Sequence, residues 1–118
     1  RCHTADEDID ASAEWAKLMA RVSLIPMAPG THPEASFGHL MGYDAGYYGY
    51  LWSEVYAQDL YSKFEKEGLL NEKLGREYRR WILEAGGSRD EGESLRGFLG
   101  REPNDAAFLK DIGLDSSK

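Results

Sequence analysis

One short segment of the chain, from Phe37 to Trp52, carries residue types that could do chemistry on a bound ligand. It holds four of the seven tyrosines, four of the 13 glycines and one of the three histidines. A tyrosine offers a hydroxyl on a rigid ring, and glycine gives the backbone unusual conformational freedom. The segment therefore predicts a mobile loop that presents phenol groups to a ligand.

The glycines Gly38, Gly42 and Gly46 are spaced four residues apart, which would place them on one face of a helix. A glycine in a helix interior costs roughly 1 kcal/mol relative to alanine, so three of them would nearly cancel the stability of a short helix. We therefore interpret 38–46 as a Gly-rich loop. The alternative is a helix whose small residues allow a close contact with another helix.

Three tyrosines of the segment, Tyr43, Tyr47 and Tyr50, are spaced four and three residues apart and would share a face if the segment were helical. Tyr48 would then point elsewhere, toward a core with Trp52. Such a stripe is typical of a helix packed against a core. However, the adjacent glycine loop and the need of buried hydroxyls for partners favour a ligand-facing role. The residues alone leave both interpretations open.

The rest of the pattern predicts an all-α fold of four to five helices with almost no strand. Apolar residues recur at helical spacing over 15–22, after a capping box of Thr4 with Glu7 or an N-cap at Asp10 or Ser12. Further helices are predicted over about 47–67, 71–83, 90–99 and 106–112. The apolar residues expected on inner faces include Tyr47, Leu51, Val55, Leu60, Phe64, Leu74, Tyr78, Trp81 and Ile82.

Capping residues, glycines and a proline mark where these helices begin and end. Asn71 and Asp90 are expected N-caps, because their side chains accept hydrogen bonds from the first turn. Gly68 and Gly100 are expected just after C-terminal ends, where a left-handed backbone is common. Pro103 is expected in the first turn of the last helix.

No metal site is expected from this chain alone. The stretch that starts at His32 resembles the beginning of a zinc-binding His-Glu-x-x-His motif, but Pro33 stands where the glutamate is required and no second histidine follows at the right spacing. His32 and His39 are separated by proline and glycine, so they do not present two imidazoles on adjacent turns of one helix. Cys2 is the only cysteine, which excludes a disulfide framework and a cysteine zinc site.

Bulk composition excludes several functions. The chain has 118 residues, which fits a single domain, 1–118, and its formal net charge of −7 argues against nucleic-acid binding, which needs a basic surface. No apolar run approaches the ~18 residues of a membrane-spanning helix, so no membrane partner is expected. The chain begins at Arg1, as a processed product or a fragment would, and its tail, 115–118, is expected to be disordered.

The Tyr-rich block resembles the C-terminal part of the thimet oligopeptidase/neurolysin family of zinc metallopeptidases. The resemblance rests on Phe37-Gly-His-Leu followed by Tyr43-Asp-Ala-Gly-Tyr-Tyr-Gly-Tyr-Leu-Trp. It continues in Gly86-Gly-Ser, in Phe98-Leu-Gly-Arg-Glu-Pro and in Phe108-Leu-x-x-x-Gly-Leu. It covers nearly the whole chain, from about residue 13 to residue 114.

The resemblance implies an almost entirely helical enzyme with a deep channel that admits only short peptides. It also implies one zinc ion held by His-Glu-x-x-His and a downstream glutamate, and none of these ligands is in this chain. The chain is therefore expected to be a C-terminal fragment of the helical catalytic domain of a zincin-type oligopeptidase, inactive alone. Its expected partners are short peptide substrates and the remainder of the parent domain, and zinc is the cofactor of the parent.

The resemblance also implies roles for individual residues. Tyr50 corresponds to the tyrosine whose hydroxyl stabilises the tetrahedral oxyanion. Tyr43 and Tyr47 correspond to tyrosines that hold the substrate and shape the pocket. His39 corresponds to a loop histidine that contacts the peptide backbone. The glycines that would let the loop open and close are Gly38, Gly42 and Gly46.

One departure from the family pattern lies between His39 and Tyr43. The thimet-type pattern has two glycines there, whereas this chain has Gly42 alone, a spacing closer to the mitochondrial intermediate peptidase branch. The expected location is cytoplasmic, with the mitochondrion as the alternative. The competing function is a stand-alone helical peptide- or protein-binding module without hydrolytic activity. Self-association or partial disorder of the isolated chain is expected, because apolar surface that met other helices of the parent would be exposed.

Overall fold

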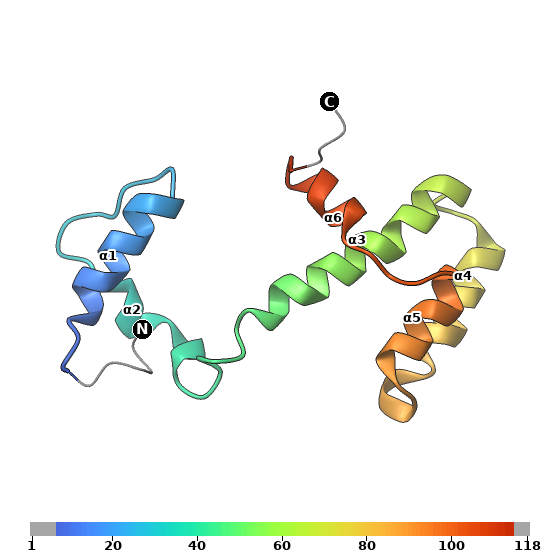
Figure 1. Ribbon diagram of the computed structural model, residues 1–118, viewed down its shortest axis with the longest axis horizontal. Helices are drawn as coiled ribbons and strands as arrows, with labels where there is room; N and C mark the ends of the chain where they lie inside the picture. The colour runs from blue at the N-terminus through green and yellow to red at the C-terminus, as the bar shows by residue number, and fades with distance from the viewer. Residues whose placement is uncertain (1–6, 115–118) are drawn as a thin grey trace. The chain divides into compact units, whose positions relative to one another are not determined.

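The computed structural model describes residues 7–114, and over that range the chain is helical with no β-strand. The predicted all-α fold is confirmed. The predictions of a cap at Thr4 and of a disordered tail at 115–118 lie outside the described residues. Between residues 7 and 114, no helix is long and apolar enough to cross a membrane. The chain divides into two compact units, Arg1–Tyr47 and Tyr48–Lys118, and each is described by itself (Figure 1).

The first unit is built on α1 (Ala11–Val22), whose N-terminus is capped by Asp10. Asp10 Oδ1 accepts a hydrogen bond of 3.0 Å from the Ala13 N–H, which selects Asp10 among the predicted caps. No residue of α1 is buried, and Leu18 of its apolar stripe is 55% exposed. The stripe therefore keeps surface that this unit does not cover.

A short helix that the sequence pattern did not predict, α2 (Pro33–Ser36), follows the proline-rich turn after α1. Pro33 occupies its first position, where the missing N–H has no cost because that group has no partner within the helix. The Ser12 hydroxyl at the start of α1 donates to the Glu34 carboxylate of α2, which joins the two helices. A 3₁₀ turn, η1 (Gly38–Leu40), follows.

The second unit begins with α3 (Gly49–Glu67). Gly68 ends this helix with a φ of +106°, which glycine tolerates, and its N–H donates to the Phe64 carbonyl at 2.8 Å. The next helix, α4 (Glu72–Tyr78), starts at Asn71, whose side chain accepts a backbone hydrogen bond from the first turn. Both boundaries agree with the sequence prediction.

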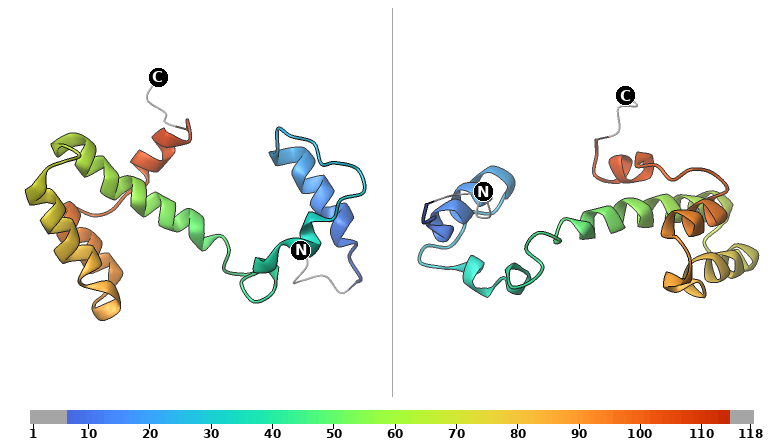
Figure 2. Two further views of the ribbon diagram at one scale, coloured as in Figure 1. Left: turned by 180° about the vertical axis from the view of Figure 1, so that it is seen from behind. Right: turned by 60° about the horizontal axis from the view of Figure 1, so that its bottom comes forward.

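α4 continues into a π-helical segment, η2 (Arg79–Leu83), in which the Glu84 N–H donates to the Arg79 carbonyl five residues back. A 3₁₀ turn, η3 (Gly86–Ser88), then leads to α5 (Glu91–Leu99), whose cap at each end is as predicted. α4 with η2 runs antiparallel to α5, and the pair lies beside the second half of α3 (Figure 2).

The last helix, α6 (Ala106–Asp111), packs on α3. The helix predicted over 106–112 is confirmed at its start, whereas the expected place of Pro103 in a first turn is wrong, because Pro103 precedes the helix by three residues. The chain before it is held in a non-helical conformation by Asn104. The Asn104 N–H donates to the Asp59 carboxylate at 2.9 Å, and its Oδ1 accepts from the Ala106 N–H at 3.0 Å.

The core of the second unit is an aromatic cluster between α3, α4 and α5. Phe98 and Leu74 are 1% exposed, and the Phe98 ring lies 5.8 Å from that of Phe64 and 5.5 Å from that of Tyr78. Burying a side chain of this size stabilises a fold by roughly 1.5–3 kcal/mol. The inward positions predicted on α4 and η2 all contact this cluster and are confirmed.

The first half of α3 does not enter this core. Tyr48 is 68% exposed and Trp52 is 55% exposed, so the predicted burial of these two rings is wrong. Leu51, also predicted to face inward, is 60% exposed. The reason is length, because α3 extends past the helices that cover its second half, and Val55 is the first of its residues to be buried (Figure 1).

Candidate functional site

The Gly-rich segment 38–46 adopts turns rather than an α-helix. η1 spans its first three residues. The Tyr43 N–H then donates to the His39 carbonyl at 3.0 Å, and the Gly46 N–H donates to the Tyr43 carbonyl at 3.1 Å. Gly42 has a φ of +110°, which residues with a side chain rarely adopt. The backbone is thus a series of tight turns that requires glycine at position 42.

The other two glycines of the segment differ in what surrounds them. A Cβ atom added to Gly46 would lie 3.0 Å from the Tyr43 ring, so the absence of a side chain lets this ring approach the backbone closely. Gly38 has an ordinary φ, and no atom lies within 4 Å of an added Cβ. Local geometry therefore accounts for glycine at position 46 but not at position 38.

Aromatic rings cluster around these turns. The Tyr47 ring lies 4.9 Å from Phe37 and 5.0 Å from His39, and the His39 ring lies 6.0 Å from Tyr43. The Phe37 ring also meets Trp15 of α1 edge-on at 5.8 Å. Contacts of this kind stabilise by roughly 0.5–1.5 kcal/mol each. The structure thus brings together His39, Tyr43 and Tyr47, the ring residues to which the resemblance assigns substrate binding. The cluster also contains Phe37 and Trp15, to which the resemblance assigns no role.

Tyr50 lies in the second unit, in the first turn of α3, and is 56% exposed. Because α3 begins at Gly49, Tyr43 and Tyr47 precede the helix, so the shared helix face that their spacing would give does not exist. Tyr43 is 45% exposed and Tyr47 is 43% exposed. These three tyrosines do not form a buried stripe, and each keeps about half of its surface accessible.

A serine, a histidine and a glutamate meet at the junction of α1 and α2. Ser12 Oγ lies 3.0 Å from His32 Nδ1 and donates to Glu34 Oε1, while the same Nδ1 lies 3.3 Å from Glu34 Oε1. A hydrolytic triad requires the serine on one ring nitrogen and the acid on the other. Both use Nδ1 here, so the group is a link between helices rather than a nucleophilic site. The hydrogen bond from Ser12 lowers the pKa of Glu34.

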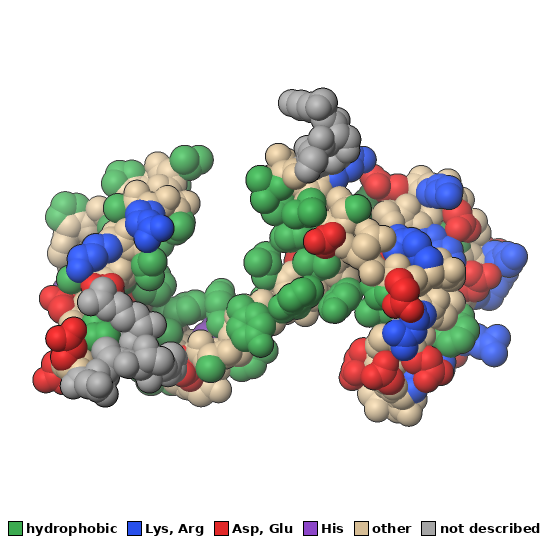
Figure 3. Space-filling view, viewed as in Figure 1, with side chains coloured by type: hydrophobic (Ala, Val, Ile, Leu, Met, Phe, Trp, Pro, Cys, Tyr) green, Lys and Arg blue, Asp and Glu red, His purple; other side chains and the backbone are tan. Residues whose placement is uncertain are grey.

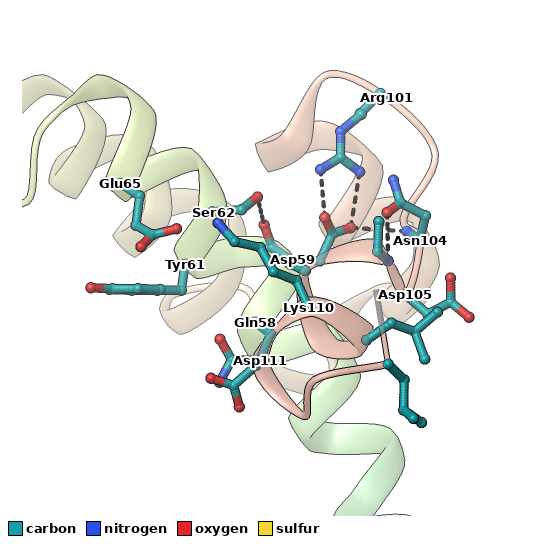
Figure 4. A pocket seen from close by; sticks show the side chains of 14 residues that line it. Gln58, Asp59, Tyr61, Ser62, Glu65, Arg101, Asn104, Asp105, Lys110 and Asp111 are labelled. Carbon is teal, nitrogen blue, oxygen red and sulfur yellow. Dashed lines mark hydrogen bonds and ion pairs between the residues drawn. The ribbon is translucent and has the colours of Figure 1, made fainter. Parts of the chain in front are cut away.

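Asp59, on the inner face of α3, is a buried carboxylate with 1% exposure. Arg101 donates to its two oxygens at 2.9 and 2.5 Å, and the Asn104 N–H donates at 2.9 Å (Figure 4). Burial opposes the charge, but these hydrogen bonds and the Arg101 charge outweigh it and hold the pKa of Asp59 below its usual value. The hydrogen bond to Asp59 raises the pKa of Arg101.

Neither residue of this ion pair was predicted from the sequence to have a role. The sequence pattern that could have indicated the pair is the position of Asp59, four residues after Val55, which is buried. This spacing places the carboxylate on the inward face of the helix. A cavity of about 880 Å³ opens beside the pair, and its walls carry charges of both signs, such as those of Glu65 and Lys110 (Figure 4). The mixed charges select no one class of ligand, so we assign the pair a structural role, which is to hold α6 on α3.

The family model for Peptidase family M3 matches residues 1–114. The chain belongs to this family. Its relatives include thimet-like oligopeptidase of Dictyostelium discoideum, 46% identical over 101 residues, and saccharolysin of Saccharomyces cerevisiae, 49% identical over 107 residues. These alignments cover 85% and 86% of this chain but 15% of each relative.

A third M3 relative, mitochondrial intermediate peptidase of Coprinopsis scobicola, is 35% identical over 111 residues, which are 92% of this chain and 14% of that protein. The resemblance to the thimet oligopeptidase family is thus confirmed over most of the chain. The chain spans about 15% of the length of the curated relatives that it matches. Most of the sequence of those peptidases therefore has no counterpart in these 118 residues.

The M3 family is zinc-dependent in general, and protein zinc sites use three or four His, Cys, Asp or Glu side chains. Within 7–114, no three such side chains lie together in a way that could hold a metal ion. His32 and Glu34 are neighbours, but the third member of their group is the Ser12 hydroxyl. The described residues of this M3 chain therefore do not fit a zinc ion.

Proposed function

We propose that this chain is the C-terminal part of the catalytic domain of a zinc metalloendopeptidase that cleaves short peptides. The observation that carries the proposal is the M3 match over residues 1–114, with alignments that cover 15% of the longer relatives. Zinc would be held by residues outside this chain and would activate the attacking water. The chain alone is proposed to be inactive. A cytoplasmic location belongs to the proposal, with the mitochondrion as the alternative.

Within that parent, Tyr50 stabilises the oxyanion. Peptide hydrolysis places negative charge on the carbonyl oxygen of the scissile bond in the transition state. A neutral phenol hydroxyl that donates to this oxygen binds the charged transition state better than the neutral substrate, which lowers the barrier. The 56% exposure of Tyr50 in the first turn of α3 supports this role, because a substrate can reach the side chain.

The loop residues bind the substrate. His39, Tyr43 and Tyr47 form one ring cluster, and each carries a ring nitrogen or hydroxyl that can hydrogen-bond to a peptide. Glycine at position 42 gives the backbone conformational freedom there, which would let the loop change conformation as a peptide enters. The remaining glycines of the segment share this role.

The test is Tyr50→Phe in the full-length parent, assayed by steady-state cleavage of a short fluorogenic peptide. Loss of one oxyanion donor costs roughly 3–4 kcal/mol, so kcat should fall about 10²–10³-fold while KM changes little. Tyr48→Phe is the matched control, since Tyr48 is 68% exposed and has no assigned role. Equal kcat values for the two variants would overturn the role of Tyr50.

The competing function is a stand-alone helical peptide- or protein-binding module without hydrolytic activity, and it differs from the peptidase in whether further sequence accompanies these 118 residues. The peptidase requires a His-Glu-x-x-His motif there, whereas the module does not. Elemental analysis of the protein purified at its natural full length separates the two, because one zinc ion per chain supports the peptidase and none supports the module.

A further inference from the structure

The Gly-rich loop 38–46 is closed at its base by the two rings that flank it. Phe37 directly precedes the loop, and Tyr47 directly follows it. Their rings meet edge-on, with centroids 4.9 Å apart and planes at 79°. Loops of about 6–16 residues whose ends lie close together are compact units packed by their own side chains. Segment 38–46 has the geometry of such a loop, and Phe37 and Tyr47 form its clasp.

Phe37 has no polar group to offer a substrate, but it contacts two residues that do. Its ring lies 5.6 Å from that of His39, in addition to its contact with Tyr47. The proposed function assigns both of these residues to peptide binding. Phe37 is half-buried, whereas His39 and Tyr47 are exposed. A change at Phe37 can therefore affect a bound peptide through the positions of these two rings.

The clasp is anchored on α1. The Phe37 ring meets the ring of Trp15, in the second turn of α1, edge-on at 5.8 Å. One turn earlier on α1, the Ser12 hydroxyl donates to Glu34, which lies three residues before Phe37. A polar and an aromatic contact therefore hold Phe37 against α1. On the face shown in Figure 3, hydrophobic side chains, tyrosine among them, gather along the chain that leads into α3.

We propose that Phe37 is a positioning residue for peptide binding, whose ring holds the Tyr47 and His39 rings ready for the substrate and keeps the base of the loop closed. The inference rests on the proposed function, because it deepens the roles given there to Tyr47 and His39. Ordering these rings before the peptide arrives removes part of the entropy cost of binding. Gly42 lies at the middle of the loop, so the backbone can change conformation there while the clasp stays closed.

Steady-state cleavage of a short fluorogenic peptide by the full-length parent tests the effect on binding. Phe37→Leu keeps an apolar side chain but removes the ring, so KM should rise about 2–10-fold while kcat changes less than about 2-fold. Phe64→Leu is the matched control, because Phe64 makes ring contacts at 5.7 and 5.8 Å in the core of the second unit. It should lower the Tm without raising KM. An unchanged KM in Phe37→Leu, or an equal rise in both variants, would overturn the proposal.

A double-mutant cycle checks that Phe37 acts through Tyr47. Tyr47→Leu removes a proposed substrate contact and one half of the clasp. Adding Phe37→Leu to that variant should raise KM by a smaller factor than Phe37→Leu does in the original protein, because the two residues act as a unit. Factors that simply multiply would show that Phe37 acts independently of Tyr47 and would contradict a positioning role.

Hydrogen exchange of the full-length parent without substrate, followed by mass spectrometry, tests the clasp apart from activity. The Tyr43 and Gly46 amides donate to carbonyls within the loop, so opening of its base should speed their exchange. Phe37→Leu should raise exchange in 38–46 and leave α5 unchanged, whereas Phe64→Leu should do the reverse. Unchanged exchange in 38–46 would refute the clasp even in a parent that cleaves peptides normally. A parent that cleaves no peptide would instead overturn the proposed function, and exchange would still decide whether the clasp exists.

Discussion

The Asp59–Arg101 pair allows a sharp prediction because its two partners differ in burial. The Asp59 side chain is 2% exposed, and the Arg101 side chain is 43% exposed. Arg101→Met leaves a buried carboxylate with the Asn104 N–H as a remaining donor. Asp59→Asn leaves a guanidinium that water can reach. Loss of the arginine should therefore cost more stability than loss of the acidic charge.

The magnitudes follow from these two environments. Arg101→Met should lower the free energy of unfolding at pH 7 by about 3–5 kcal/mol, the range for a buried charge that loses its partner. Asp59→Asn keeps the volume and an acceptor for the Asn104 N–H. Its amide nitrogen cannot accept a hydrogen bond, so one of the two hydrogen bonds from Arg101 is lost and the other loses the carboxylate charge, and the substitution should cost about 1.5–3 kcal/mol.

Urea unfolding followed by far-ultraviolet circular dichroism measures both free energies. The control is Arg96→Met, because the Arg96 side chain is 48% exposed and its acidic neighbours, Asp90 and Glu102, lie 3.8 and 3.7 Å away. An exposed pair of this kind is worth little, so the control should change stability by less than about 0.5 kcal/mol. A cost for Asp59→Asn that equals or exceeds the cost for Arg101→Met would refute the reasoning from burial.

The same pair predicts a pH dependence. The pKa of Asp59 is lowered in the folded chain, so its stabilisation is fully present above the unfolded value of about 3.9 and is lost as the pH falls through the folded value. In Arg101→Met, burial is no longer outweighed and raises the pKa of Asp59. The stability deficit of that variant should therefore shrink as the pH falls from 7 toward 4. A deficit that stays constant over this range, measured by urea unfolding, would contradict the prediction.

Two further predictions concern the helices of the second unit. Gly97→Ala would place a Cβ atom 2.4 Å from the Trp81 ring and should lower the free energy of unfolding by about 1–3 kcal/mol. In contrast, Gly75→Ala, with no atom within 4 Å, should raise it by about 0.5–1 kcal/mol. Thermal unfolding of the two variants side by side checks the contrast, and a gain in Gly97→Ala would argue against the close approach. Asp90→Ala should cost about 1 kcal/mol, because Asp90 Oδ1 caps α5 through the Glu93 N–H at 3.0 Å. Urea unfolding should show Asp90→Ser near the original stability, and equal losses in both variants would count against capping.

Helix ends in the second unit could be predicted because the groups that make them are close in sequence. Asn71 and Asp90 accept hydrogen bonds from the turn that follows them, and Gly100 adopts a left-handed backbone without a distant contact. The prediction for Pro103 failed for the opposite reason. The hydrogen bond from Asn104 to Asp59 joins residues 45 apart in sequence and helps to hold the chain around Pro103 in a non-helical conformation before α6.

In the candidate site, too, some features could be predicted from the nearby sequence and others could not. Gly42 could be recognised as a turn residue from its type, and the structure places it at a positive φ. The exposure of Tyr48 and Trp52 could not be predicted, because a helical apolar stripe looks the same whether its partner is in this chain or outside it. The Asp59–Arg101 pair was missed because an acidic residue on a helix usually faces solvent, and only the fold brings the arginine to it.

The π-helical segment η2 has a consequence for how the chain accommodates a change in its length. In an α-helix one inserted residue rotates every later side chain by about 100°. A π turn instead confines an extra residue to a local widening. In η2 the Glu84 N–H meets the Arg79 carbonyl at 2.8 Å, and Trp81 within it packs against Gly97. Deletion of one exposed residue of η2, Arg79 or Arg80, is therefore expected to convert η2 to an α-helical turn without changing the register of α5 on α3.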